Sequence, residues 1–361
     1  MTTATLEMKP LTPERECRAY LLWEPASKEA AVIDVRFDAV QHTLPVLAEL
    51  GLKLKYAIDT HTHADHLSGS DRLRNVTGCK VVMSSATRSR VPDHLVQDGS
   101  VLRLGDYELR FLHTPGHTPD SMCIFDGARV FTGDTLFIGS AARTDFMGGS
   151  SEQLFESFRK IEKLGGGVQV WPGHDYNGKF SSTVGAELKA NSAFADSKAG
   201  LVDRLNIKGA LPANMAEVLS FNTEAGLAEA QIITPQQLAG LGVAGKDYTL
   251  LDVRYADEWA AGRAPGAVFV PMPEVSSRFD EIRKLPHPIV SICRSGVRAT
   301  MMMMTARHAG DNGWLLLEGG MTAWQNAHLP MESDSGTPKV IASKFSTGGS
   351  CQSGDRTCDA Q

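Results

Sequence analysis

The stretch Thr60-His61-Thr62-His63-Ala64-Asp65-His66 follows directly after an extended apolar run, Leu54–Asp59. It places three histidines and an aspartate within six residues, at the end of a segment that we expect to be a strand. Imidazole and carboxylate groups on a loop that is held by a strand are typical ligands of a metal ion. The stretch therefore predicts a metal site at one edge of a sheet.

Three further candidate ligands follow, each at a turn after a strand or strand-like run: His117, Asp134 and His174. A glycine precedes each of them, which lets the backbone turn sharply and the side chain point inward. Any one of these residues alone could be an ordinary turn or surface residue, but all of them in this order favour a metal centre. The ligand types suit zinc and iron almost equally, and the seven candidate groups could hold two zinc ions.

The segments around these residues differ in pattern along the chain. Before residue 182, extended apolar runs recur with short turns and few helices, which predicts packed sheets with helices outside. From about Ser182 to Ala228 the pattern is helical and rich in Ala, Lys and Glu. Helix and strand then alternate strictly from Thr234 to Ala327, which is typical of a small α/β domain with a parallel sheet covered on both faces.

The length of 361 residues predicts two or three domains. We expect a first domain of class α+β and a second domain of class α/β, joined by a helical linker. A flexible tail rich in Ser, Gly, Thr and Asp follows, because such a composition buries little apolar surface. The expected boundaries are 1–193, 194–230, 231–331 and 332–361.

Composition excludes several classes of function. With 36 Lys and Arg against 42 Asp and Glu, a formal charge of −6 and no basic run, nucleic acid and membrane surfaces are poor candidate partners. No apolar stretch approaches the roughly 18 residues of a membrane span. Early acidic residues such as Glu7 and Glu14 argue against a signal peptide or a mitochondrial presequence. The six cysteines are too sparse for a disulfide framework, so we expect a cytoplasmic protein.

The order of the candidate ligands resembles the metallo-β-lactamase superfamily, whose fold is an αββα sandwich of two sheets. Within that superfamily, hydrolases such as glyoxalase II use all these positions to hold two metals, but the sequence looks closer to the persulfide dioxygenases. Asp120 and Ser121 follow the His117 turn, an Arg-Thr-Asp-Phe run occupies 143–146, and Trp171–Tyr176 also fits the pattern.

This resemblance implies one Fe(II) per chain, held by His61, His117 and Asp134 as in the facial triad of non-haem iron oxygenases. Four neighbouring groups would orient these ligands through hydrogen bonds rather than bind the metal. They are His63, Asp65, His66 and His174.

The resemblance also implies the substrate and the reaction. Glutathione persulfide would react with O2, both oxygen atoms would be added to its terminal sulfur, and hydrolysis would release sulfite and glutathione. Arg143 offers a cationic, bidentate anchor for the carboxylates of this substrate. Tyr176 would lie next to the substrate thiol.

A second chemical signal lies in Ser291–Arg298, where Cys293 ends an expected strand and a helix begins. A thiol in this place faces the amides of the first helical turn and the positive end of the helix dipole, which should lower its pKa. The same amides can bind an anion. The loop residues that could contact a substrate are Arg294, Ser295, Gly296, Val297 and Arg298.

This loop, together with Leu251–Arg254 and Gly319–Trp324, resembles the rhodanese fold over about Ile233–Pro330. The resemblance implies a sulfurtransferase in which Cys293 carries a persulfide and passes sulfane sulfur between thiosulfate and glutathione. The whole chain then resembles a persulfide dioxygenase–rhodanese fusion of sulfur metabolism, with a homodimer as a further expectation. Two alternatives stay open: a dinuclear zinc thioesterase of the glyoxalase II type fused to a rhodanese, and a non-catalytic persulfide carrier.

Overall fold

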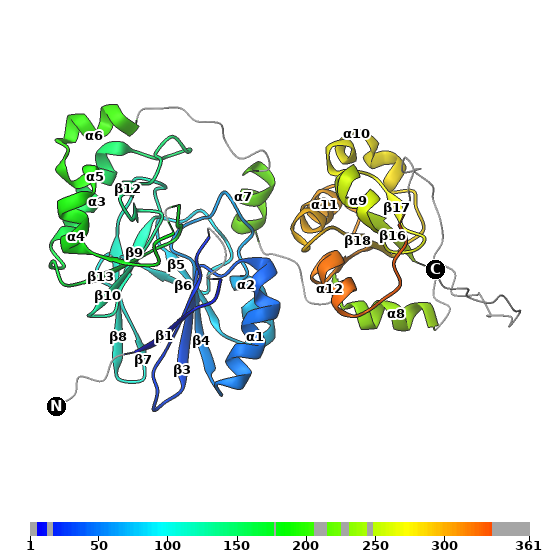
Figure 1. Ribbon diagram of the computed structural model, residues 1–361, viewed down its shortest axis with the longest axis horizontal. Coiled ribbons are helices and arrows are strands. Elements are labelled where there is room, and N and C mark those ends of the chain that lie inside the picture. The colour runs from blue at the N-terminus through cyan, green and yellow to red at the C-terminus, as the bar shows by residue number, and fades with distance from the viewer. Residues whose placement is uncertain are drawn as a thin grey trace, which may run out of the picture. The chain divides into compact units, whose positions relative to one another are not determined.

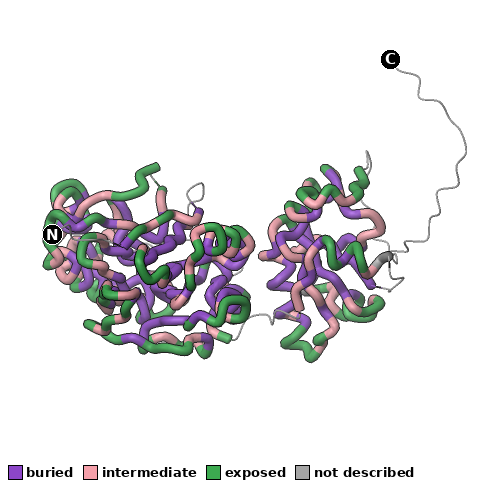
Figure 2. Tube along the Cα trace, turned by 90° about the horizontal axis from the view of Figure 1, so that it is seen from below, coloured by how far each residue is buried: buried purple, intermediate pink, exposed green. Residues whose placement is uncertain are grey.

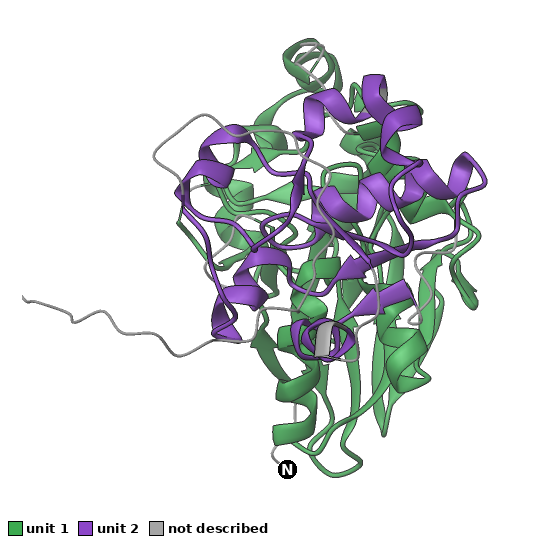
Figure 3. Cartoon of the chain, turned by 90° about the vertical axis from the view of Figure 1, so that its right-hand side faces the viewer, with its two compact units in different colours: residues 1–229 green, residues 230–361 purple. Residues whose placement is uncertain are grey.

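The chain divides into two compact units, residues 1–229 and 230–361, and each is described by itself (Figures 1 and 3). Among the residues that the computed structural model describes, no helix is long and apolar enough to cross a membrane. The described residues are 6–12, 17–176, 178–205, 215–224, 231–243 and 248–333. The expected tail therefore lies outside them, apart from its first two residues.

A six-stranded sheet in chain order forms one layer of unit 1. Its pairs are antiparallel from β1 to β3 and parallel from β3 to β6. The parallel part matters for the site, because the carboxyl ends of β3, β4 and β5 meet at the same edge. The strands are β1 Glu7–Pro10, β2 Tyr20–Trp23, β3 Glu29–Ile33, β4 Lys53–Ile58, β5 Lys80–Ser84 and β6 His94–Val96.

A second six-stranded sheet has the order β14-β13-β10-β9-β8-β7, in which only the β10–β13 pair is parallel. Two short strands between β10 and β13 in the sequence, β11 Leu136–Phe137 and β12 Ser140–Ala141, form a separate two-stranded sheet. The strands of the large sheet are β7 Val101–Leu104, β8 Tyr107–His113, β9 Met122–Phe125, β10 Arg129–Gly133, β13 Gln169–Pro172 and β14 Ser182–Thr183.

A shared hydrophobic core joins the two sheets face to face. Ile33 and Ile58 from the first sheet lie in one buried cluster with Phe111 and Phe131 from the second. Helices cover the outer faces: residues of α1 and α2 pack on the first sheet, and residues of α3 to α6 pack on the second. The predicted αββα sandwich is confirmed. These helices are α1 Val40–Glu49 (after the short 3-10 turn η1 Phe37–Ala39), α2 Ser70–Thr77, α3 Ser151–Glu162, α4 Val184–Ala190, α5 Ser192–Ala195 and α6 Lys198–Leu205.

The described part of the expected linker, 194–230, packs as part of unit 1, which corrects that expectation. Helix α6 buries Leu201 completely in the core beneath the second sheet. Helix α7 (Met215–Thr223) places the ring of Phe221 5.6 Å from that of Phe37 in an edge-to-face contact. A helical composition does not show whether a helix is an exposed spacer or packs on a domain, because both kinds of helix contain a few apolar residues.

Unit 2 contains a five-stranded, all-parallel sheet in the order β15-β19-β18-β16-β17, so the predicted parallel sheet is confirmed. Figure 2 shows buried residues concentrated inside each unit and exposed residues on its surface. The strands are β15 Ile232–Ile233, β16 Thr249–Asp252, β17 Val268–Phe269, β18 Ile289–Ile292 and β19 Trp314–Leu317. The helices are α8 Pro235–Val243, α9 Ala256–Ala261, α10 Met272–Ile282, α11 Val297–His308 and α12 Gly320–Asn326.

Replacing Leu201 with Ala tests whether α6 is part of unit 1. Since the side chain is fully buried, we expect Leu201→Ala to lower the free energy of unfolding of unit 1 by about 2–4 kcal/mol. Calorimetric melting of the full chain would measure this shift separately from the melting of unit 2. Asp203→Ala changes an exposed residue of the same helix and serves as the control. Equal, small effects of both variants would show that α6 is a spacer.

Candidate metal centre and cysteine loop

The candidate ligands of unit 1 come from the strand ends, as the sequence predicts. The histidine loop begins directly after β4, and Asp34 follows β3 at the same edge. His117 lies between β8 and β9, Asp134 follows β10, and His174 follows β13. The first sheet therefore supplies one half of the centre and the second sheet the other half.

His61, His117 and Asp134 are buried, and one ligand atom from each lies within 4.8 Å of the others. The Nδ1 of His117 donates to the carbonyl oxygen of Arg143 at 2.8 Å, so its Nε2 carries the free lone pair. That Nε2 lies 3.8 Å from Oδ2 of Asp134. The Nε2 of His61 is buried and has no hydrogen-bond partner among the described residues. An orphaned imidazole nitrogen beside a second one and a carboxylate is what a metal ion would satisfy.

A hydrogen-bond chain fixes the orientation of His61. The Nδ1 of His61 lies 2.9 Å from Oγ1 of Thr60, and that hydroxyl donates to Oδ2 of Asp34 at 2.9 Å. Because the hydroxyl hydrogen goes to Asp34, Thr60 accepts from Nδ1–H of His61, and Nε2 is left as the ligand atom. Burial, followed by the nearby charge of His63, lowers the pKa of His61 to about 3, so the ring is neutral, the form that binds metal.

Two glycines allow these groups to approach so closely. Gly133, with a φ of +47°, lies against Thr60, and a Cβ in its place would collide with Oγ1 of that residue. A Cβ at Gly173 would come within 2.6 Å of Oδ1 of Asp134. The glycines before Asp134 and His174 therefore serve close packing as well as the turns that the sequence predicts.

The four neighbouring groups are hydrogen bonded around this trio. The Nδ1 of His174 lies 2.7 Å from Oδ1 of Asp134, and its Nε2 lies 3.0 Å from Oδ2 of Asp65. The same Asp65 oxygen lies 3.1 Å from Nδ1 of His66, and Nε2 of His63 lies 3.1 Å from Oδ1 of Asp34. Within the described chain, Nδ1 of His63 and Nε2 of His66 are buried without a hydrogen-bond partner, so these rings could also ligate.

A pocket of about 550 Å³ opens onto the trio, with His117, Asp134 and His174 in its wall. The two predicted substrate contacts also line it. The ring of Tyr176 stacks on that of His174, with the centroids 5.7 Å apart, and 61% of the residue is exposed. Arg143 is bonded to Asp145 by Nε at 2.6 Å and Nη2 at 2.7 Å, so a substrate carboxylate would share this cation with Asp145.

Asn222 of α7 is a residue of the site that the sequence analysis missed. Its buried amide donates from Nδ2 to the carbonyl oxygens of His63 and His66 at 2.9 and 2.8 Å, and Oδ1 accepts from the N–H of Ser68 at 2.8 Å. It thus holds the backbone of the histidine loop from a position more than 150 residues away in the chain. The only sequence signal is a polar residue on the apolar face that contains Val218 and Phe221.

In unit 2, Cys293 follows β18 and its Sγ accepts a hydrogen bond from the N–H of Gly296 at 3.2 Å. The predicted loop therefore places amides around the sulfur. Burial nevertheless raises the pKa of Cys293, against the lowering effects of the backbone amides and Arg298. This is opposite to the direction expected from the helix dipole alone, because the thiol is only 1% exposed and the desolvation of a thiolate dominates.

The two arginines of the cysteine loop have different surroundings. Arg298 forms a bidentate ion pair with Glu258 at 2.5 and 2.7 Å, and its guanidinium lies 4.9 Å from the centroid of the Tyr255 ring. The side-chain hydrogen bond from Arg298 is the main reason that the pKa of Glu258 is lowered to about 2. Arg294 is exposed. An anionic substrate would therefore meet the charge of Arg294 first.

The fold and the buried ligand trio indicate a metal site in a unit of the metallo-β-lactamase type, which a rhodanese-like unit follows in the chain. The family model of the metallo-β-lactamase superfamily matches residues 13–174, and that of the rhodanese-like domain matches residues 234–327.

Individual relatives narrow this assignment. The mitochondrial persulfide dioxygenase ETHE1 of Bos taurus is 37% identical over 209 residues, which covers 54% of this chain and 82% of that protein. The crystal structure of ETHE1 from Myxococcus xanthus superposes with a TM-score of 0.54 at 33% identity, covering 59% of this chain and 99% of that one. A hydroxyacylglutathione hydrolase of Methylococcus capsulatus is 33% identical, covering 56% of this chain and 80% of that protein.

The chain belongs to the metallo-β-lactamase superfamily and, within it, to the family of the ETHE1 persulfide dioxygenases, with a rhodanese-like domain after it. The predicted family is confirmed. These relatives support an enzyme of sulfur metabolism with a metal site in unit 1.

Replacing Asn222 tests the support of the histidine loop. We expect Asn222→Ala to weaken metal binding by about 10- to 100-fold, because three loop contacts are lost while the ligands stay in place. Competition with a chelator measures the affinity, and circular dichroism checks the fold. Ser220→Ala, on the same helix, is the control. Unchanged metal affinity in a folded Asn222→Ala protein would contradict a positioning role.

The Glu258–Arg298 pair predicts a pH-dependent stability of unit 2. The pKa of Glu258 is lower in the folded protein than in the unfolded chain, so its contribution is present above pH 5 and is lost as the pH falls towards 2. We expect Glu258→Gln to destabilise unit 2 by about 1 kcal/mol at pH 7, and by progressively less at lower pH. Urea unfolding at several pH values measures this. As a control, Glu274→Gln removes a more exposed partner of Arg278 and should have a smaller effect on stability. Equal effects of the two variants would contradict a specific contribution of the Glu258–Arg298 pair.

Proposed function

We propose that unit 1 is a non-haem Fe(II) dioxygenase that converts glutathione persulfide and O2 to sulfite and glutathione. The observation that carries this proposal is the buried trio His61, His117 and Asp134, in which hydrogen bonds direct both imidazole Nε2 atoms to one point. Two imidazoles and one carboxylate are the ligand set of mononuclear iron oxygenases. The ETHE1 relatives are named persulfide dioxygenases, which supports the same substrate class.

Fe(II) held by the trio would supply open coordination positions and the electrons that activate O2. The residues of the chain have separate tasks. Asp34 and Thr60 hold His61 in the neutral tautomer, and His174 holds the Asp134 carboxylate. Arg143 and Tyr176 line the pocket, where they would bind the glutathionyl part of the substrate. In the overall reaction both atoms of O2 are added to the terminal sulfur, and water then cleaves the sulfur–sulfur bond.

Unit 2 is, in this proposal, a sulfurtransferase that works through Cys293. The thiolate attacks the sulfane sulfur of thiosulfate, the sulfur–sulfur bond breaks and sulfite leaves. Glutathione then removes the sulfur from the Cys293 persulfide and becomes glutathione persulfide. The amide of Gly296 supports the charge on Sγ, and the exposed Arg294 attracts the anion. The product of this step is the substrate proposed for unit 1. The reverse direction uses the same groups.

A second candidate for unit 1 is a dinuclear zinc thioesterase. The hydrolase relative from Methylococcus capsulatus and the unpaired nitrogens of His63 and His66 favour it, because those rings could contribute to a second metal site. The homodimer and the cytoplasmic location stay predictions from the sequence.

Oxygen uptake separates these candidates. We expect the iron-loaded protein to consume O2 when glutathione persulfide is added, and the zinc-loaded protein not to. Asp134→Ala should lower the rate of O2 uptake more than about 100-fold, because it removes a ligand and the hydrogen-bond partner of His174. Cys293→Ser should keep uptake with glutathione persulfide but lose uptake driven by thiosulfate plus glutathione. No uptake by a protein shown to contain iron, with hydrolysis of S-lactoylglutathione by the zinc form, would favour the thioesterase.

A further inference from the structure

Cys17 is a thiol of the pocket to which neither proposed activity assigns a role. It lies just before β2, and its backbone forms an isolated antiparallel bridge with that of His174. The side chain is half-buried and lines the same pocket as His117 and Asp134. A sulfur compound that enters the pocket towards the ligand trio therefore meets this thiol on the pocket wall.

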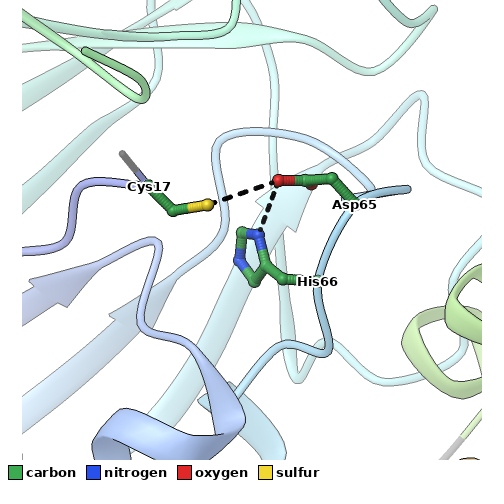
Figure 4. A group of neighbouring side chains, drawn as sticks. All are labelled: Cys17, Asp65 and His66. Carbon is green, nitrogen blue, oxygen red and sulfur yellow. Dashed lines mark hydrogen bonds and ion pairs between the residues drawn. The ribbon is translucent and has the colours of Figure 1, made fainter. Parts of the chain in front are cut away.

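Charged and polar groups surround the Cys17 sulfur. The guanidinium of Arg36 donates from Nη1 to Sγ at 3.4 Å. The Cys17 thiol donates to Oδ2 of Asp65 at 3.6 Å, and Figure 4 shows that Sγ and Nδ1 of His66 turn towards this same oxygen. The Nε2 of His66 is the buried, unpaired ring atom noted above. The thiol thus sits in a polar cluster, with a carboxylate that can accept its proton on one side and the guanidinium of Arg36 on the other, which suits a reactive thiol better than apolar packing does.

The other free cysteines of unit 1 have the opposite surroundings. Cys79 and Cys123 are buried in the apolar clusters between each sheet and the helices that cover it. Burial raises the pKa of Cys123 to about 11. Cys17, by contrast, is only half-buried, lines the pocket and has the guanidinium of Arg36 3.4 Å from its sulfur. Geometry and charge therefore distinguish Cys17 from the two packed thiols.

We propose that Cys17 is a sulfur-acceptor site, which takes the sulfane sulfur of a low-molecular-weight persulfide that enters the pocket. The Cys17 thiolate attacks the outer sulfur of the persulfide, a new sulfur–sulfur bond forms at Cys17, and the original one breaks. The leaving thiolate takes up a proton, so the exchange is redox-neutral and needs no other reactant. Arg36 stabilises the negative charge before and after the transfer.

This inference rests on the proposed function, because it takes the persulfide as the compound that enters the pocket. It adds a second fate for the same sulfur. When O2 is absent, the Cys17 persulfide holds one sulfane sulfur within the pocket, and a thiol can remove it by the reverse exchange. The site would therefore buffer the reactive substrate beside the metal centre.

The test is mass spectrometry of the full-length, iron-loaded protein after anaerobic incubation with glutathione persulfide and rapid alkylation. We expect Cys17 to gain the mass of one sulfur atom, and Cys79 and Cys123 to gain none. Arg36→Gln should slow labelling of Cys17 several-fold, whereas Arg74→Gln, which removes a different arginine of unit 1, should not. A parallel incubation of the Cys293→Ser protein shows whether the sulfur reaches Cys17 directly.

The outcomes separate this proposal from the proposed function. Labelling of Cys17 in the Cys293→Ser protein supports the acceptor site, whatever the oxygen electrode shows. An unlabelled Cys17 in a sample that still consumes O2 with glutathione persulfide overturns the acceptor site and leaves the dioxygenase standing. A glutathionyl group at Cys17, instead of a single sulfur, also overturns it, because the thiol would then have attacked the inner sulfur. Equal labelling of Cys79 or Cys123 overturns the selectivity that the surroundings of Cys17 predict.

Discussion

The hydrogen-bond chain from Asp34 through Thr60 to His61 is the constraint on which the metal centre depends. Asp34 follows β3 and Thr60 follows β4, so the parallel pairing of these strands brings the two residues together. Gly133 allows β10 of the other sheet to pack directly against Thr60. The same contact thus fixes the ligand atom of His61 and joins the two halves of the sandwich. Without this hydrogen-bond chain, Nε2 of His61 would not be fixed as the ligand atom.

Much of this arrangement follows from the sequence. The strand before His61, the turns before His117 and Asp134, and the parallel sheet around Cys293 all have local signatures, and the structure brings the predicted ligands together. The role of Asn222 could not be predicted, because its three hydrogen bonds reach residues more than 150 positions away in the chain. Nothing in the sequence around Asn222 indicates these partners. The raised pKa of Cys293 could not be predicted from the sequence either, because the burial that raises it depends on the packing of the whole unit.

The two units present sulfur chemistry in two different electrostatic settings. Around Cys293, backbone amides and the charge of Arg298 act on a deeply buried thiol. Around Cys17, a guanidinium and imidazoles face a half-buried one on a pocket wall. The first setting is built by a strand-to-helix loop and the second by groups that converge from separate segments. The two settings therefore act differently on a sulfur anion, because burial disfavours the thiolate of Cys293 and a guanidinium lies beside the sulfur of Cys17.

A single metal ion bound by His61, His117 and Asp134 is the central feature of the proposed dioxygenase. X-ray absorption at the iron edge of the purified protein, together with its metal content, tests this directly. We expect one iron per chain, with nitrogen and oxygen neighbours that include two imidazoles, and no second metal nearby. Two metal ions per chain with a metal–metal distance of roughly 3.5–4 Å, as in dinuclear hydrolases, would contradict it.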